Sequence, residues 1–222
     1  MSTDMSNVPT QSIGDAAHAI VKAALSAVPV VGGPAVELFQ FVVQPALEKR
    51  RAAWMSTVGE RLKRLEEGGL DLRTLQNNEE FISTVMQASQ AALRTHNAEK
   101  LAALRNAIVN IARGQSPDET TQHLLLTLVD TLSEMHLRIL KVAQAPKLPP
   151  GMGLGGLGSI LEYGIPELRE HRELYDQLWK DLYTRGLLNT ENLHVTMSAN
   201  GLMQRRTTGL GETLLRFISE AE

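Results

Sequence analysis

The sequence contains no cysteine. This absence excludes disulfide bridges, thiolate zinc sites, iron–sulfur clusters and a cysteine nucleophile. Aromatic residues are also scarce, at 4% of the 222 residues. The stretch 82–162 holds none of them, so the middle of the fold has to pack on aliphatic side chains. Apolar residues still make up 43% of the chain and charged residues 21%, which is typical of a globular protein.

The chain also lacks an excess of positive charge. Its 22 Lys and Arg against 25 Asp and Glu give a net charge of −3, which argues against broad, non-specific binding of nucleic acid. The one basic stretch is 48–64, where six basic residues face two acidic ones. Residues 1–14 contain no Lys or Arg, and a secretory signal needs both a basic start and an apolar core. We therefore expect a cytoplasmic protein, with a peripheral position at the inner membrane as the open alternative.

Motifs that carry catalysis are missing as well. No two histidines stand three or four residues apart, as a helical metal site would require. No Gly-x-Ser-x-Gly nucleophile elbow occurs. We therefore predict no catalytic residue, no metal site, no cofactor and no small-molecule substrate. Carboxylate pairs that meet only in the fold stay open.

What the sequence does contain is helical periodicity, which predicts a mainly α fold. We expect a helical bundle over 13–143, a Pro/Gly-rich linker or loop over 144–160, and a smaller unit over 161–219. Gly32, Gly33 and Gly68 delimit the second helix. The helices expected in the bundle are 13–31, 34–67, 78–95, 98–113, one that follows a Ser116 cap with Pro117 as its first residue, and 133–143.

The last sixty residues predict a winged-helix-like α/β unit. One helix is expected over 166–185, and a closing helix over 210–219. Between them lie two strand-like runs, 193–197 and 202–207, joined by a turn that contains Asn200-Gly201. Asn-Gly between two such runs is a strong β-hairpin signal.

The segment 20–43 is mostly apolar and is broken by a Gly-Gly turn, which predicts an apolar helical hairpin. Neither arm supplies the about 20 clean apolar residues of a spanning helix, so burial in the bundle or self-association is favoured. The following basic residues also suit an anionic lipid surface, and a hairpin released by a trigger is a third possibility. The candidate membrane or partner surface consists of Val36, Phe39, Phe41, Val42, Val43, Lys49, Arg50 and Arg51.

The C-terminal unit has two interpretations. A winged helix can bind DNA through a helix in the major groove, with Arg205 and Arg206 on the wing. However, the helix 166–185 carries five acidic residues against four basic ones, and phosphate contacts need a basic face. We therefore favour a protein-interaction or packing module. Its column of Tyr175, Trp179 and Tyr183 is a candidate interface stripe, with a role in the core as the alternative.

Three segments carry a family resemblance. They are Leu132-Ser133-Glu134-Met135-His136-Leu137-Arg138-Ile139-Leu140, Leu182-Tyr183-Thr184-Arg185-Gly186-Leu187-Leu188 and Thr207-Thr208-Gly209-Leu210-Gly211-Glu212-Thr213-Leu214-Leu215. Over about residues 78–219 their layout resembles the Abi-alpha type of bacterial abortive-infection (phage-resistance) proteins and related uncharacterised bacterial proteins. The resemblance implies a bacterial or phage-borne protein with a role in defence, and it transfers no catalytic residue.

Together these features predict a non-enzymatic interaction or effector protein. We expect it to act on a protein partner, a second copy of itself or a membrane surface through the N-terminal apolar hairpin. A winged-helix transcriptional regulator that binds DNA is the alternative prediction.

Overall fold

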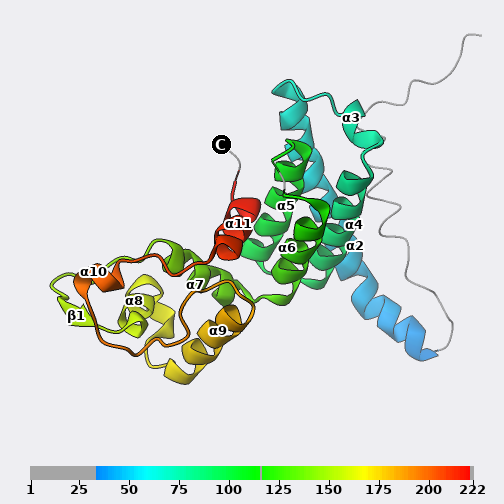
Figure 1. Ribbon diagram of the computed structural model, residues 1–222. Helices are drawn as coiled ribbons and strands as arrows, with labels where there is room; N and C mark the ends of the chain where they lie inside the picture. Colours follow the sequence, from blue (N-terminus) through cyan, green and yellow to red (C-terminus); the bar gives the residue numbers. More distant parts are fainter. Residues whose placement is uncertain (1–33, 116, 221–222) are drawn as a thin grey trace, which may run out of the picture. The chain divides into compact units, whose positions relative to one another are not determined.

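The computed structural model describes residues 34–115 and 117–220 (Figure 1). The predicted helix 13–31 therefore lies outside the described residues. The described chain is mainly helical, as predicted, with one small two-stranded antiparallel sheet. None of its helices is both long enough and apolar enough to cross a membrane.

The described chain forms two compact units. The first contains 34–96 and 104–126, and the second contains 97–103 and 127–220. Two helices contribute residues to both units. Apart from residues 97–103, the chain passes from the first unit to the second near residue 127. The helices that supply the first unit are α2 (Pro34–Glu67), α3 (Arg73–Gln76), α4 (Glu79–Arg94), α5 (Ala98–Ala112) and α6 (Glu119–Thr131).

Helix α2 packs on α4 through a stripe that repeats every three or four residues. Its buried members are Trp54, Val58, Leu62 and Leu65. The predicted bounds of this helix, 34–67, are confirmed. Helix α4 begins at a cap, where the Asn78 side chain accepts a hydrogen bond from the Phe81 amide. In Figure 1 the first turns of α2 extend past α4.

The start of α6 differs from the prediction. Ser116 lies outside the described residues, and Pro117 precedes the helix, which begins at Glu119. Asp118 supplies the cap, because its Oδ1 accepts the Thr121 amide at 3.1 Å and its Oδ2 accepts the Thr121 hydroxyl at 2.6 Å. A carboxylate at this position satisfies an amide that has no partner inside the helix.

The second unit is built around helix α7 (Glu134–Gln144). That helix contacts three others, α8, α9 and α11, and buries Leu137, Ile139 and Leu140. The elements of this unit are α7 (Glu134–Gln144), β1 (Leu154–Gly155), α8 (Leu157–Gly164), the 3-10 helix η1 (Pro166–Leu168), α9 (Arg172–Thr184), β2 (Met197–Ser198), α10 (Ala199–Leu202) and α11 (Gly209–Ile218).

The predicted β-hairpin of 193–207 is wrong. Strand β2 pairs with β1, with Leu154 opposite Ser198 and Gly155 opposite Met197. The predicted turn, Asn200-Gly201, lies inside α10, because the Ser198 hydroxyl accepts the Gly201 amide and caps a helical turn instead. From the predicted second strand, Thr207 forms an isolated bridge to Leu188. The wing of a winged helix is therefore missing from the described residues.

Two further segments depart from the sequence analysis. The Pro/Gly run supplies β1 and the start of α8, and Gly156 lies so close to segment 190–195 that an added Cβ would stand 2.9 Å from the Leu193 carbonyl oxygen. The single helix predicted for 166–185 is wrong, since η1 and α9 are separate. They are separated at Glu170, whose φ of 67° is left-handed and cannot continue a right-handed helix.

Candidate interaction surface

The described part of the predicted apolar hairpin is exposed. Leu38 is 66% exposed, Phe41 80% and Val42 65%. The expectation that this segment is buried in the bundle is therefore wrong for these three residues, which we name the α2 outer face. Val43 is half-buried. The side chains of Val36 and Phe39 lie outside the described residues.

The α2 outer face is exposed because the first turns of α2 extend past α4 (Figure 1), and none of the described side chains before Trp54 is buried. Its position around the helix axis adds to this. With 3.6 residues per turn, its centre lies roughly 160° from the centre of the stripe that packs on α4. A regular helix cannot bury two nearly opposite faces against one neighbour. The stripe around Val58 is buried, so the α2 outer face needs a second partner if it is to leave water.

A shallow hollow of about 490 Å³ runs beside Phe41 along α2. Phe41 and Pro45 supply its apolar wall, and Gln40, Gln44 and Glu48 supply polar groups. Helix α2 therefore offers a docking element with an apolar ridge and polar groups next to it.

Of the three basic residues that follow this face, one forms an ion pair and the other two are exposed. Lys49 and Arg50 are exposed, and Lys49 stands eleven residues after Leu38, about three turns along the same face. Arg51 is less exposed and pairs with Glu48 at 3.4 Å. The α2 outer face is thus continued by one positive charge, with a second on the adjacent side.

The column Tyr175, Trp179 and Tyr183 does not form one exposed stripe. Tyr175 and Trp179 are buried, while Tyr183 is 38% exposed. The Trp179 indole Nε1–H donates to the Thr190 carbonyl at 2.9 Å, and the Tyr175 hydroxyl donates to Glu162 at 3.0 Å. Burial, together with Glu162, raises the pKa of Tyr175 to about 12. These two aromatic residues hold the second unit together from within.

The two arginines of the predicted wing have internal partners. Arg205 pairs with Glu212 at 2.9 Å. Arg206 is half-buried and donates from one terminal nitrogen to the Gly201 carbonyl at 2.5 Å, with Met197 Sδ at 3.3 Å. Neither guanidinium is arranged as a free phosphate contact on a β-ribbon.

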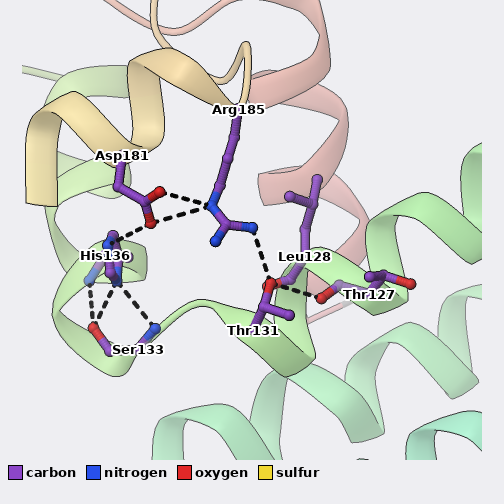
Figure 2. A network of polar contacts seen from close by, with 7 residues as sticks. All are labelled: Thr127, Leu128, Thr131, Ser133, His136, Asp181 and Arg185. Atoms are coloured by element: carbon purple, nitrogen blue, oxygen red, sulfur yellow. Dashed lines mark hydrogen bonds and ion pairs between the residues drawn. The ribbon is translucent and has the colours of Figure 1, made fainter.

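A polar network in the second unit was not found by sequence reasoning (Figure 2). Ser133 caps α7, and His136 lies three residues on, where its Nδ1 accepts both the Ser133 amide at 3.1 Å and the Ser133 hydroxyl at 2.7 Å. On the other side of the ring, Nε2 lies 3.2 Å from Asp181 Oδ2. Arg185 completes the network with bonds to Asp181 and to the Thr131 hydroxyl, both at 3.1 Å.

The order serine, histidine, aspartate matches that of a nucleophilic triad, but the details favour a capping box. The lone pair on His136 Nδ1, which would have to take the hydroxyl proton, is already shared with the Ser133 backbone amide. Asp181 is neutralised by Arg185, which bonds both of its carboxylate oxygens. The contacts account for a helix cap tied to α9. The sequence signal was present in Ser133-x-x-His136, a serine cap with a polar residue three positions on.

A second histidine pair borders a cavity of about 300 Å³ beside α9. His194 Nε2 lies 2.7 Å from Asp176 Oδ1, and Lys180, Glu191 and Asn192 also line this space. Among the described residues no group of three or more His, Asp or Glu side chains could hold a metal ion. The cavity is open and its charges are mixed, so it indicates no particular ligand.

Comparisons with known proteins yield no relative: no protein-family model, no curated protein and no solved structure matches the chain.

Proposed function

We propose that this chain is a non-enzymatic interaction or effector protein that engages its partner through the α2 outer face. One observation carries the proposal: Leu38, Phe41 and Val42 are each at least 65% exposed on one face of one helix. Single exposed apolar residues are ordinary, whereas a contiguous group of large ones is typical of an interaction site.

The energetics support a partner that covers this face. Removing a large apolar side chain from water stabilises the bound state by about 1.5–3 kcal/mol. Three such side chains at positions i, i+3 and i+4 form a short ridge of the kind that helix-in-groove partners bind. A protein partner, with a second copy of this chain as the first case to test, would bury Phe41 in a groove and leave the charged residues at the rim.

A second candidate is an anionic membrane surface, and the placement of Lys49 favours it. A helix that lies in the interface buries its apolar residues among the lipid chains and holds its cations at the headgroups. Lys49 continues the α2 outer face, and Arg50 is exposed beside it. Each cation near an anionic surface contributes about 1 kcal/mol.

The experiment compares the full chain with Phe41→Glu and with Leu174→Glu. Leu174 is 50% exposed on α9, so its variant controls for adding a charge at an exposed leucine. Sedimentation velocity measures self-association, and flotation with phosphatidylglycerol vesicles measures membrane binding. The proposal expects the unmodified chain and Leu174→Glu to associate or to float, and Phe41→Glu to do neither. If the unmodified chain neither self-associates nor floats, self-association and binding to an anionic membrane are both rejected.

The double variant Lys49→Glu/Arg50→Glu separates the two partners. Loss of flotation with intact self-association indicates a membrane, because removing the cations abolishes attraction to anionic lipid. Intact flotation of this variant on phosphatidylglycerol vesicles rejects the electrostatic part of the membrane candidate. We also propose, from the resemblance alone, that the interaction serves phage defence, and a comparison of plaque counts with and without the gene tests this.

The predicted alternative, a winged-helix transcriptional regulator, gains no support from the described residues. Its two wing arginines have internal partners, and the hairpin that would form the wing is replaced by the β1–β2 pairing. We therefore do not propose that this chain binds DNA.

A further inference from the structure

We propose that His136 is a pH-sensitive cap: when its Nδ1 takes up a proton, the cap that holds the start of α7 opens. The inference does not rest on the function proposed above, since it concerns the second unit. It starts from the contacts in Figure 2 that tie Ser133, His136 and Asp181 together.

The hydrogen bonds fix the tautomer of the imidazole. The backbone N–H of Ser133 can only donate, and it points at Nδ1 at 3.1 Å. Nδ1 must therefore carry a lone pair, and the ring proton sits on Nε2, which donates to Asp181 at 3.2 Å. Protonation can occur only at Nδ1. The Ser133 hydroxyl, 2.7 Å away, can turn and accept the new N–H, but the Ser133 backbone N–H then faces another N–H and loses its acceptor.

Protonation costs more here than it does for a histidine in water. Only 12% of the His136 side chain is exposed. Asp181 on α9 attracts the positive ring, but Arg185 on α9 and Lys100 on α5 repel it. Burial is the largest cause that lowers the pKa of His136 below 6.5, and the two cations add to it against Asp181.

The consequence follows from the position of His136 in α7. The Ser133 amide would lose its acceptor, and the first amides of a helix have no partner inside the helix. The next backbone bond, from the Leu137 amide to the Ser133 carbonyl, is long at 3.3 Å. Because the pKa of folded His136 is lowered, its contribution to stability is present above 6.5. That contribution is lost as the pH falls through the folded pKa.

The matched variant is His136→Gln. Glutamine at this position can reach back to the amide of a serine cap, as in a standard capping box, but it does not titrate. His194→Gln is the control, because His194 also bonds a carboxylate of α9, Asp176, and does not cap a helix. All three proteins keep the full chain.

The measurement is NMR of the imidazole signals and of amide exchange from about pH 7.5 to about pH 5. We expect the His136 ring to titrate below its ordinary value, and the Ser133 amide shift to follow the same curve. The protection of the Leu137 amide is expected to fall roughly fivefold over that range, the size of one lost capping hydrogen bond. In His136→Gln we expect the protection of the Leu137 amide to stay nearly constant over this range, because glutamine does not titrate.

Three results overturn the inference. One is a His136 titration at or above its ordinary value. The second is a Ser133 amide shift that does not follow the ring. The third is equal loss of Leu137 protection in His136→Gln and in the unmodified chain. If His136→Gln does not fold, the first two readings on the unmodified chain still decide the question, with His194→Gln assigning the second histidine.

Discussion

The indole Nε1–H of Trp54 donates a hydrogen bond of 2.9 Å to the hydroxyl oxygen of Ser89, and both side chains are buried. The two residues lie 35 positions apart and join α2 to α4. This bond fixes which face of α2 enters the first unit around Trp54.

Removing one partner of this bond is expected to destabilise the first unit. Ser89→Ala leaves the indole N–H buried without an acceptor, which costs about 1–3 kcal/mol. Trp54→Phe removes the donor, and the smaller ring also leaves a cavity. Urea unfolding of both variants and of the double variant measures the coupling. Strictly additive losses would mean that the two side chains do not interact.

Gly211→Ala is expected to destabilise the second unit by about 1–3 kcal/mol, the range for overpacking. A Cβ on Gly211 would stand 2.3 Å from the Leu187 carbonyl oxygen, which is backbone and cannot turn away. Gly209→Ala is the matched control in the same helix, because a Cβ there meets nothing within 4 Å. Thermal unfolding of the two variants should separate them, and equal melting temperatures would contradict the close approach.

Tyr175 is expected to ionise late in an alkaline titration. Its pKa of about 12 arises mainly from burial and then from its bond to Glu162. The raised value means that the folded state favours the neutral phenol, so stability is lost as the pH rises above 10 toward 12. Phenolate absorbance measures this, and Tyr175→Phe should remove the late step. If the late step persists in that variant, the assignment to Tyr175 is wrong.

Because the α2 outer face is exposed, a charged substitution there should change the free energy of unfolding very little. Val42→Asp places a charge at a residue that is 65% exposed, so its free energy of unfolding should stay within about 0.5 kcal/mol of the unmodified chain. Val58→Asp, at a residue only 2% exposed, should cost several kcal/mol because the charge is buried without a partner. Chemical denaturation compares the two, and similar losses would contradict the exposure.

Local rules explain which elements the sequence could predict. The bounds of α2 agree with the Gly-Gly pairs that flank it in the sequence, and the cap at Asn78 follows from residue type. The β-hairpin predicted from Asn200-Gly201 is wrong for two reasons. The Ser198 cap makes this dipeptide part of a helical turn, and the strand that pairs with β2 is β1, more than forty residues earlier. Glu170, whose left-handed backbone separates η1 from α9, is neither Gly nor Asn, the residue types that usually mark such a conformation in a sequence.

The candidate site was predictable only in part. The apolar character of Leu38, Phe41 and Val42 is evident in the sequence, but their exposure depends on how far α2 extends past α4, which the sequence does not give. The face of α2 that packs on α4 is visible in the sequence as the stripe through Trp54 and Leu62. Helical periodicity therefore predicts that the α2 outer face points away from that stripe. The contact between His136 and Asp181 joins two helices far apart in the chain, and one sequence carries no signal for it.

The absence of cysteine allows the most direct test of the central claim. Phe41→Cys gives the chain a single thiol, which an environment-sensitive fluorophore such as acrylodan can label. Leu174→Cys, labelled in the same way, reports on an exposed site outside α2. The account predicts water-like emission from both labels in dilute protein. At high protein concentration or on anionic vesicles, the label at 41 alone should shift to the blue. A label at 41 that is already in an apolar environment in dilute protein, or that never shifts under either condition, would contradict it.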